Sequence, residues 1–151
     1  MGYTEVRTHV RISKETDMEK VEQYLSEFGT DEMHMRQKDY VTLNTEMVSF
    51  ENFEEVAIEI SARLGLNVLV SLVYDSDVAV LQGYVSGDKK YEEVKSLEEN
   101  VEMDRQQFIQ DFFPDCNVSD ISEILDKTDY LFAEDRLFEL GDVLGLELLE
   151  Q

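Results

Sequence analysis

The feature that most constrains the fold is a pair of apolar runs, residues 68–74 (VLVSLVY) and 78–85 (VAVLQGYV), separated by Asp75-Ser76-Asp77. Each run has the length and the valine-rich composition of a strand. Asp and Ser favour turns because their side chains bond to nearby backbone amides. The pattern therefore predicts a β-hairpin. The first run is apolar on both faces apart from Ser71, which predicts an interior strand covered on both sides.

Strand patterns also precede this hairpin. Residues 3–12 alternate Tyr, Glu, Arg, His and Arg with Val, Thr, Val and Ile, and this period of two predicts a half-buried strand. Residues 33–49 predict two short strands, with a turn placed at residues 36–39.

Two helices are predicted between these strands. The first has Thr16 and Glu19 at the spacing of a capping box, and Gly29 at the place of a left-handed C-terminal cap. The second begins near Asn52, carries an apolar stripe from Phe53 to Leu64, and ends at Gly65.

The remainder of the chain is predicted to be mainly helical. Ser86-Gly87-Asp88 is a turn that leads to a third strand or directly to the helices. Val94, Leu97 and Val101 share one face of a helix that would begin after Tyr91. Further apolar stripes before Pro114, at residues 121–125 and at residues 132–145 predict helices.

This order of elements predicts an α+β protein. We expect a ferredoxin-like antiparallel sheet with two packed helices, an additional β-hairpin and C-terminal helices. At 151 residues the chain has the size of one domain. We expect a single domain over residues 1–151, in which residues 1–92 form the α+β sheet core and residues 93–151 form a helical extension packed on it.

The net charge limits the classes of macromolecule that can bind this protein. The chain has 35 acidic and 13 basic side chains, and the net charge is −22. Such a charge repels nucleic-acid phosphates and anionic lipids, so we expect neither nucleic acid nor a membrane as a partner. Two explanations stay open: attraction to a basic protein, such as a nuclease, or solubility in the cytosol or in a salt-loving host. The single Cys116 and the absence of an apolar signal segment predict a cytoplasmic protein.

The triplet Asp75-Ser76-Asp77 allows three interpretations. In an extended strand the two carboxylates would lie about 6–7 Å apart on one face and could hold a cation. A calcium ion needs 6–8 oxygen ligands, whereas the next residues are Val78, Ala79 and Val80. The turn of a hairpin is the simplest interpretation, and contact with a partner is the third.

No other constellation favours catalysis. His9, His34 and Cys116 have neither the spacing of a zinc site nor the partners of a nucleophile. We therefore expect no catalytic residues, no metal, no cofactor and no enzyme activity.

The stretches LVYDSDVAVLQGYVSGD and FAEDRLFELGDVLGL together resemble a family of uncharacterised bacterial proteins. In that family a V-Y-D-S-D-V strand and turn is followed by a C-terminal F-x-E-D-R-L…L-G-L helix. The resemblance covers residues 40–146 and implies a shared fold, without implying an activity.

The sequence thus predicts a non-catalytic cytosolic binding protein that acts through an acidic surface. An inhibitor or immunity-type protein for a basic toxin or nuclease is the most concrete form. The alternative is a small-molecule or metal-binding regulatory domain that uses Asp75 and Asp77. The sequence leaves the oligomeric state open. The predicted partner-binding residues are Asp75, Asp77, Asp88, Glu92, Glu93, Glu98 and Glu99.

Overall fold

A computed structural model describes residues 2–28, 35–43 and 45–150. It contains one antiparallel sheet of seven strands in the order β2-β3-β1-β4-β5-β6-β7. The strands are β1 (Glu5–Arg11), β2 (Met35–Gln37), β3 (Tyr40–Thr42), β4 (Val68–Tyr74), β5 (Val78–Val85), β6 (Asp88–Lys95) and β7 (Asn100–Glu102). The helices are α1 (Met18–Leu25), α2 (Phe53–Leu64), α3 (Arg105–Phe112), α4 (Val118–Asp126) and α5 (Ala133–Leu144), and a short 3₁₀ turn, η1 (Ser26–Phe28), follows α1.

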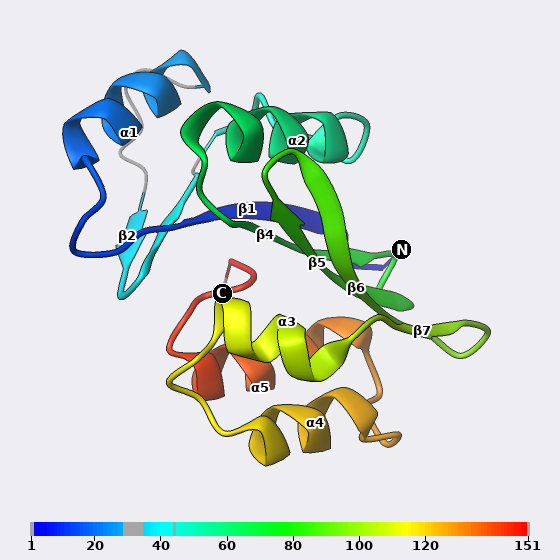
Figure 1. Ribbon diagram of the computed structural model, residues 1–151. Helices are drawn as coiled ribbons and strands as arrows, with labels where there is room; N and C mark the ends of the chain where they lie inside the picture. The colour runs from blue at the N-terminus through cyan, green and yellow to red at the C-terminus, as the bar shows by residue number, and fades with distance from the viewer. Residues whose placement is uncertain (1, 29–34, 44, 151) are drawn as a thin grey trace.

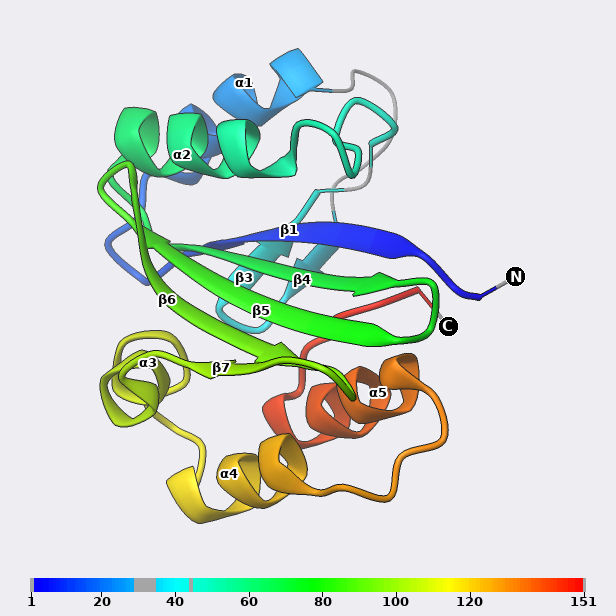
Figure 2. The same ribbon diagram turned by 90° about the vertical axis from the view of Figure 1, so that its right-hand side faces the viewer.

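Helices cover both faces of this sheet. Figures 1 and 2 show α1 and α2 on one face and α3, α4 and α5 on the other. Two apolar cores result, because alternate residues of each strand point to opposite faces. In β4, for example, Val70 belongs to the core under α2 and Leu69 to the core under α5. The α+β class and the burial of β4 on both faces are therefore confirmed.

Glycine caps end two helices as predicted. Gly65 after α2 and Gly145 after α5 both have positive φ, and each donates a hydrogen bond from its N–H to the carbonyl four residues earlier. The first helix differs at its start. Its N-cap is Asp17, whose carboxylate accepts from the N–H of Lys20, while Thr16 accepts from Ser13. Gly29 lies outside the described residues.

The helix predicted after Tyr91 is wrong. Residues 88–95 form β6, and β7 pairs with it so that Val94 lies opposite Val101. Val94 and Val101 are spaced as in a helix because they are paired residues on two adjacent strands that a turn connects. Tyr91 and Glu93 point to the other face of the sheet, where both are buried.

One glycine lets α3 approach the sheet closely. A Cβ atom on Gly83 in β5 would lie 2.9 Å from the ring of Phe112 and 3.0 Å from the ring of Phe108. Both rings are buried, and Phe108 stacks on Tyr91 with ring centroids 5.1 Å apart. This glycine therefore provides the space in which the aromatic side chains of α3 pack.

A buried ion cluster joins α3 and α4 to the sheet. The Arg105 guanidinium donates to both carboxylate oxygens of Glu93 at 3.1 and 2.8 Å and to both of Asp126 at 2.8 and 3.0 Å. Glu102 lies 3.0 Å from the same guanidinium. Burial by itself lowers the pKa of Arg105, but the hydrogen bonds to Glu93 and Asp126 reverse this and raise it above its ordinary value.

Candidate functional site

The Asp75-Ser76-Asp77 triplet forms the predicted hairpin turn. The N–H of Asp77 donates to the carbonyl of Tyr74 at 3.0 Å, and φ is positive at both Asp75 and Ser76. Positive φ at two central residues matches the twist of a hairpin, and Asp tolerates it better than most residues. The turn interpretation is confirmed.

The turn is also a junction between distant parts of the chain. The Ser76 hydroxyl accepts from the N–H of Tyr3 at 2.7 Å and donates to the Glu134 carboxylate at 2.9 Å. The Ser76 carbonyl accepts from the N–H of Ala133 at 2.9 Å. Ser76 therefore fixes the start of α5 against the residues before β1.

The two aspartates have different surroundings. The Asp75 carboxylate accepts from the N–H of Gly2 at 2.8 Å, so the residues before β1 occupy it. The Asp77 carboxylate has no hydrogen bond or ion pair with any described residue, and it lines a cleft. Of the two, Asp77 is therefore the one available to a ligand or a partner.

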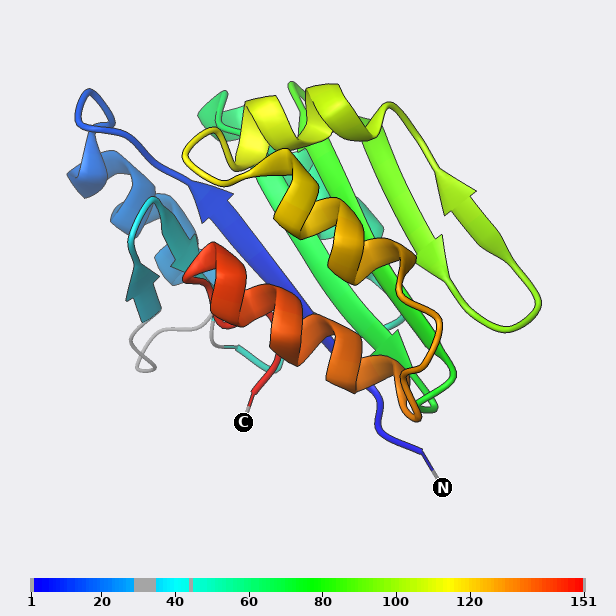
Figure 3. The ribbon, with the colours of Figure 1, turned by 90° about the horizontal axis from the view of Figure 1, so that it is seen from below.

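This cleft has a volume of about 490 Å³ and opens beside the turn. Its walls come from the 75–77 turn, the β6–β7 turn, the end of α4 and the start of α5, and Figure 3 shows these segments together at the lower right. The volume lies within the range of about 300–1,000 Å³ that is usual for small-ligand pockets. The lining residues include Ser76, Asp77, Lys95, Leu97, Leu131 and Arg136.

Three basic side chains line the cleft, and groups of the protein itself contact each of them. Lys95 Nζ lies 3.6 Å from Asp126 Oδ1, and Lys127 Nζ lies 3.8 Å from Glu139 Oε2. Arg136 donates to the carbonyls of the last turn of α4, at 2.7 Å for Leu125. Arg136 therefore stabilises the end of α4 in addition to lining the cleft.

Large apolar side chains are exposed around the cleft. Leu97, at the tip of the β6–β7 turn, is fully exposed, and Leu131 in the α4–α5 connection is 82% exposed. Phe132 is 48% exposed. On the other side of the 75–77 turn, the exposed rings of Tyr74 and Phe50 lie 5.0 Å apart. We call residues 75–77, 96–99 and 127–132 the loop end.

Carboxylates surround these apolar side chains. Glu98 and Glu99 lie in the β6–β7 turn, and their side chains, like that of Asp77, have no hydrogen bond or ion pair with the residues that the structure describes. Exposed apolar patches with a polar rim mark interaction surfaces. Asp75, Asp77, Glu98 and Glu99 thus come together at the loop end.

The other predicted partner-binding residues lie elsewhere. Asp88 is exposed at the opposite end of β6, and the half-buried Glu92 accepts from Gln82 at 2.8 Å and from Lys89 at 3.2 Å. Glu93 is only 1% exposed and is bound by Arg105. Its predicted place on the acidic surface is therefore wrong, because its carboxylate is enclosed between β6 and α3.

The remaining candidates do not come together. His9 is fully buried in β1, whereas Cys116 is half-buried in the loop before α4, and burial raises the pKa of its thiol. His34 lies outside the described residues. In the part of the chain that the structure describes, no three His, Cys, Asp or Glu side chains are grouped to hold a metal ion. No helix of this part is both long and apolar enough to cross a membrane.

Sequence patterns do not identify the exposed leucines. Helical spacing places Leu97 in an apolar stripe, although its neighbours Ser96, Glu98, Glu99 and Asn100 are polar. The exposure of Leu131 depends on how α4 and α5 pack, and no local pattern predicts it.

Comparisons with models of protein families, with curated proteins and with solved structures give no match for this chain. The functional argument therefore depends on the geometry of the loop end.

Proposed function

We propose that this protein is a non-catalytic binding protein that holds a basic macromolecular partner at the loop end. An inhibitor or immunity-type protein that neutralises a basic toxin or nuclease is the concrete form of this proposal. The observation that carries it is the gathering of exposed Leu97 and Leu131 beside the unpaired carboxylates of Asp77, Glu98 and Glu99.

The two kinds of side chain have different roles in this proposal. Exposed apolar side chains supply affinity when a partner covers them, because the removal of apolar surface from water is favourable. Carboxylates at the rim attract a basic partner and speed association, and the net charge of −22 increases this attraction over the whole molecule. We therefore expect the affinity to depend on the leucines and the association rate to depend on salt.

The proposal is tested by capturing proteins from a lysate with the wild-type protein and with matched variants as baits. Leu97→Ser/Leu131→Ser is expected to weaken retention of the basic partner about ten-fold or more, since the full burial of one leucine side chain is worth about 1.5–3 kcal/mol. The measurement is quantitative mass spectrometry of proteins captured at low salt from the organism's lysate, followed by titration with the purified partner. Because Leu97 and Leu131 are exposed, the variant should keep the wild-type melting temperature.

Two variants serve as controls. Val118→Ser removes an exposed apolar side chain at the opposite end of α4, and Asp88→Asn removes an exposed carboxylate at the opposite end of β6. Both should retain the partner as the wild type does, and about 0.5 M salt should slow its capture by all baits. If the leucine variant captures the same basic proteins as Val118→Ser, the loop end is not the binding surface.

The cleft supports a second function, a regulatory domain that binds a small molecule through Asp77. Its volume and the free Asp77 carboxylate favour this alternative, whereas Asp75 is occupied by Gly2. A ligand from a metabolite library should then raise the melting temperature of the wild type. Asp77→Asn should reduce this shift and Asp88→Asn should leave it unchanged. Equal shifts in all three proteins would contradict the use of Asp77.

We further propose a ferredoxin-like unit over residues 5–74, in a cytoplasmic protein of the uncharacterised bacterial family that the sequence resembles. The connectivity β1-α1-β2-β3-α2-β4, the strand order β2-β3-β1-β4 and the two helices on one face support the fold. The single Cys116 supports the location.

A further inference from the structure

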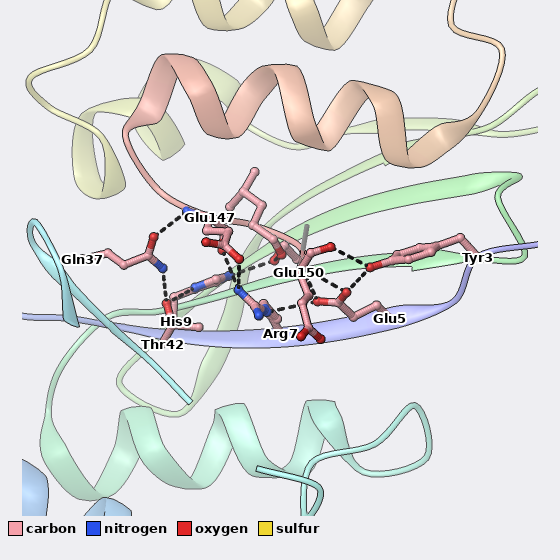
Figure 4. Close-up of polar contacts among 10 residues, drawn as sticks. Tyr3, Glu5, Arg7, His9, Gln37, Thr42, Glu147 and Glu150 are labelled. Carbon is pink, nitrogen blue, oxygen red and sulfur yellow. Dashed lines mark hydrogen bonds and ion pairs between the residues drawn. The ribbon is translucent and has the colours of Figure 1, made fainter. Parts of the chain in front are cut away.

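Residues 146–150 lie across the sheet on the side of α5, without joining it as a strand. Side chains from β2, β3 and β4, together with those on the polar face of β1 and Tyr3 just before it, form a groove around this segment (Figure 4). We call these side chains the groove: Tyr3, Glu5, Arg7, His9, Gln37, Thr42 and Ser71.

The groove binds mainly the backbone of the segment. Gln37 Oε1 accepts from the N–H of Glu147 at 2.7 Å, and the Ser71 hydroxyl donates to the carbonyl of Leu148 at 2.6 Å. The N–H of Glu150 donates to both oxygens of the Glu5 carboxylate at 3.0 and 2.9 Å. Backbone recognition of this kind is how proteins bind extended peptides.

Two further contacts concern the side chains of the segment. Leu146, Leu148 and Leu149 are buried in the core under α5. The Glu147 carboxylate lies 3.4 Å from Arg7 Nη1. The segment therefore has the features of a peptide ligand: a bound backbone, apolar anchors and one charge pair.

The hydrogen bonds of the groove form a chain with a single direction. Because Ser71 donates to Leu148, it must accept from His9, which places the histidine proton on Nε2. His9 Nδ1 then accepts from Thr42, which in turn accepts from Gln37. Both ends of this chain are backbone groups of residues 147 and 148. The chain is complete only when a segment of this kind occupies the groove.

The connection between α5 and the segment is tight. Gly145 has φ +68°, and the N–H of Leu146 donates to the carbonyl of Gly141 at 3.1 Å. A Cβ atom on Gly141 would lie 2.6 Å from the carbonyl oxygen of Leu146. The chain can therefore turn back into its own groove only because residue 141 has no side chain.

From these contacts we infer that the groove also accepts residues 146–150 of a second copy of this chain, in a reciprocal dimer. A second copy supplies the matching leucines and the matching glutamate, and the exchange closes with two-fold symmetry. While the segment is out, water can solvate the polar side chains of the groove, whereas the apolar sites of Leu146, Leu148 and Leu149 under α5 favour refilling by a second copy. Repulsion between two copies of charge −22 opposes the dimer, which therefore forms at high protein concentration and high salt.

Charge reversal across the Arg7–Glu147 pair tests this inference. Arg7→Glu places two glutamates together within one copy, and Glu147→Arg places two arginines together within another. Each variant alone should remain monomeric. An equimolar mixture at 0.5 M salt should form a 1:1 heterodimer, because exchange gives each of the two grooves one glutamate and one arginine at positions 7 and 147. The dimer fraction, measured by light scattering after size exclusion, should rise about ten-fold.

Two further variants complete the test. Arg7→Glu/Glu147→Arg in one chain restores the pair internally and should stay monomeric when mixed with wild type. Gly141→Ala brings a Cβ against the Leu146 carbonyl whichever copy supplies residue 146, so it should leave the dimer fraction unchanged. Circular dichroism verifies that each variant is folded. A mixture of the two charge variants that stays monomeric, while circular dichroism shows both of them folded, would overturn the inference.

Discussion

Arg105→Met is expected to lower the free energy of unfolding by about 3–5 kcal/mol, the cost of leaving a buried charge without its partner. The reason is Glu93, which is 1% exposed and would retain only Lys95, whose Nζ lies 3.8 Å away. Asp126 is less affected because it is largely exposed. Urea unfolding monitored by circular dichroism measures the change, which should appear as a lower midpoint with a similar slope.

Two controls separate the buried charge from lost packing. Arg105→Met/Glu93→Leu removes both buried charges and should recover most of the lost stability, because apolar residues of similar volume often replace a buried ion pair at little cost. Lys89→Met breaks surface pairs with Glu54 and with the half-buried Glu92, and it should cost less than about 1 kcal/mol. If the double variant is as unstable as the single one, the Arg105 side chain acts through packing.

Local patterns predicted the elements whose causes are local. The αL glycines at 65 and 145 end their helices because a residue without Cβ adopts positive φ easily. The turn at Asp75–Asp77 and the burial of β4 on both faces follow from composition over a few residues. Such features depend only on residues that are close together in the chain, so a single sequence is enough to predict them.

The errors arise where distant residues determine the environment. Glu93 is predicted to belong to an acidic partner-binding surface, yet Arg105, twelve residues later, encloses it. The polar face of β1 looked solvent-exposed, but residues 146–150 cover it, about 140 residues away. Neither pairing leaves a trace in the local pattern of charge and hydropathy.

The candidate site combines residues that local patterns predict with residues whose exposure depends on tertiary packing. The sequence pointed to Asp77 and to the corner of the hairpin, and that corner borders the cleft. Leu97 borders the same cleft because it lies in the β6–β7 turn. Leu131 borders it because α4 packs against α5. The exposure of the Asp77 carboxylate could be predicted from its chemistry and its place in a turn, whereas the exposure of the two leucines required the tertiary structure.

His9 is expected to make the protein less stable as the pH falls below about 6.5. Burial, with a smaller contribution from the nearby charge of Arg7, lowers the pKa of its imidazole from 6.5 to about 3. The unfolded chain therefore binds a proton between these pH values while the folded chain does not, so stability is full above pH 6.5 and declines toward pH 3. At a pH of about 4.5 the loss is roughly 2–3 kcal/mol, at about 1.36 kcal/mol per pH unit.

His9→Gln isolates this contribution, because the amide offers one acceptor to Thr42 and one donor to Ser71 without titrating. Urea unfolding of both proteins from about pH 7.5 to about pH 4.5 should show the wild type losing about 2–3 kcal/mol more than the variant. Other titrations cancel in the difference, including that of Asp126, whose pKa is held low by its hydrogen bonds to Arg105. Parallel pH profiles would mean that the folded protein accepts the proton on His9, and would contradict the one-way hydrogen-bond chain that holds residues 146–150 in the groove.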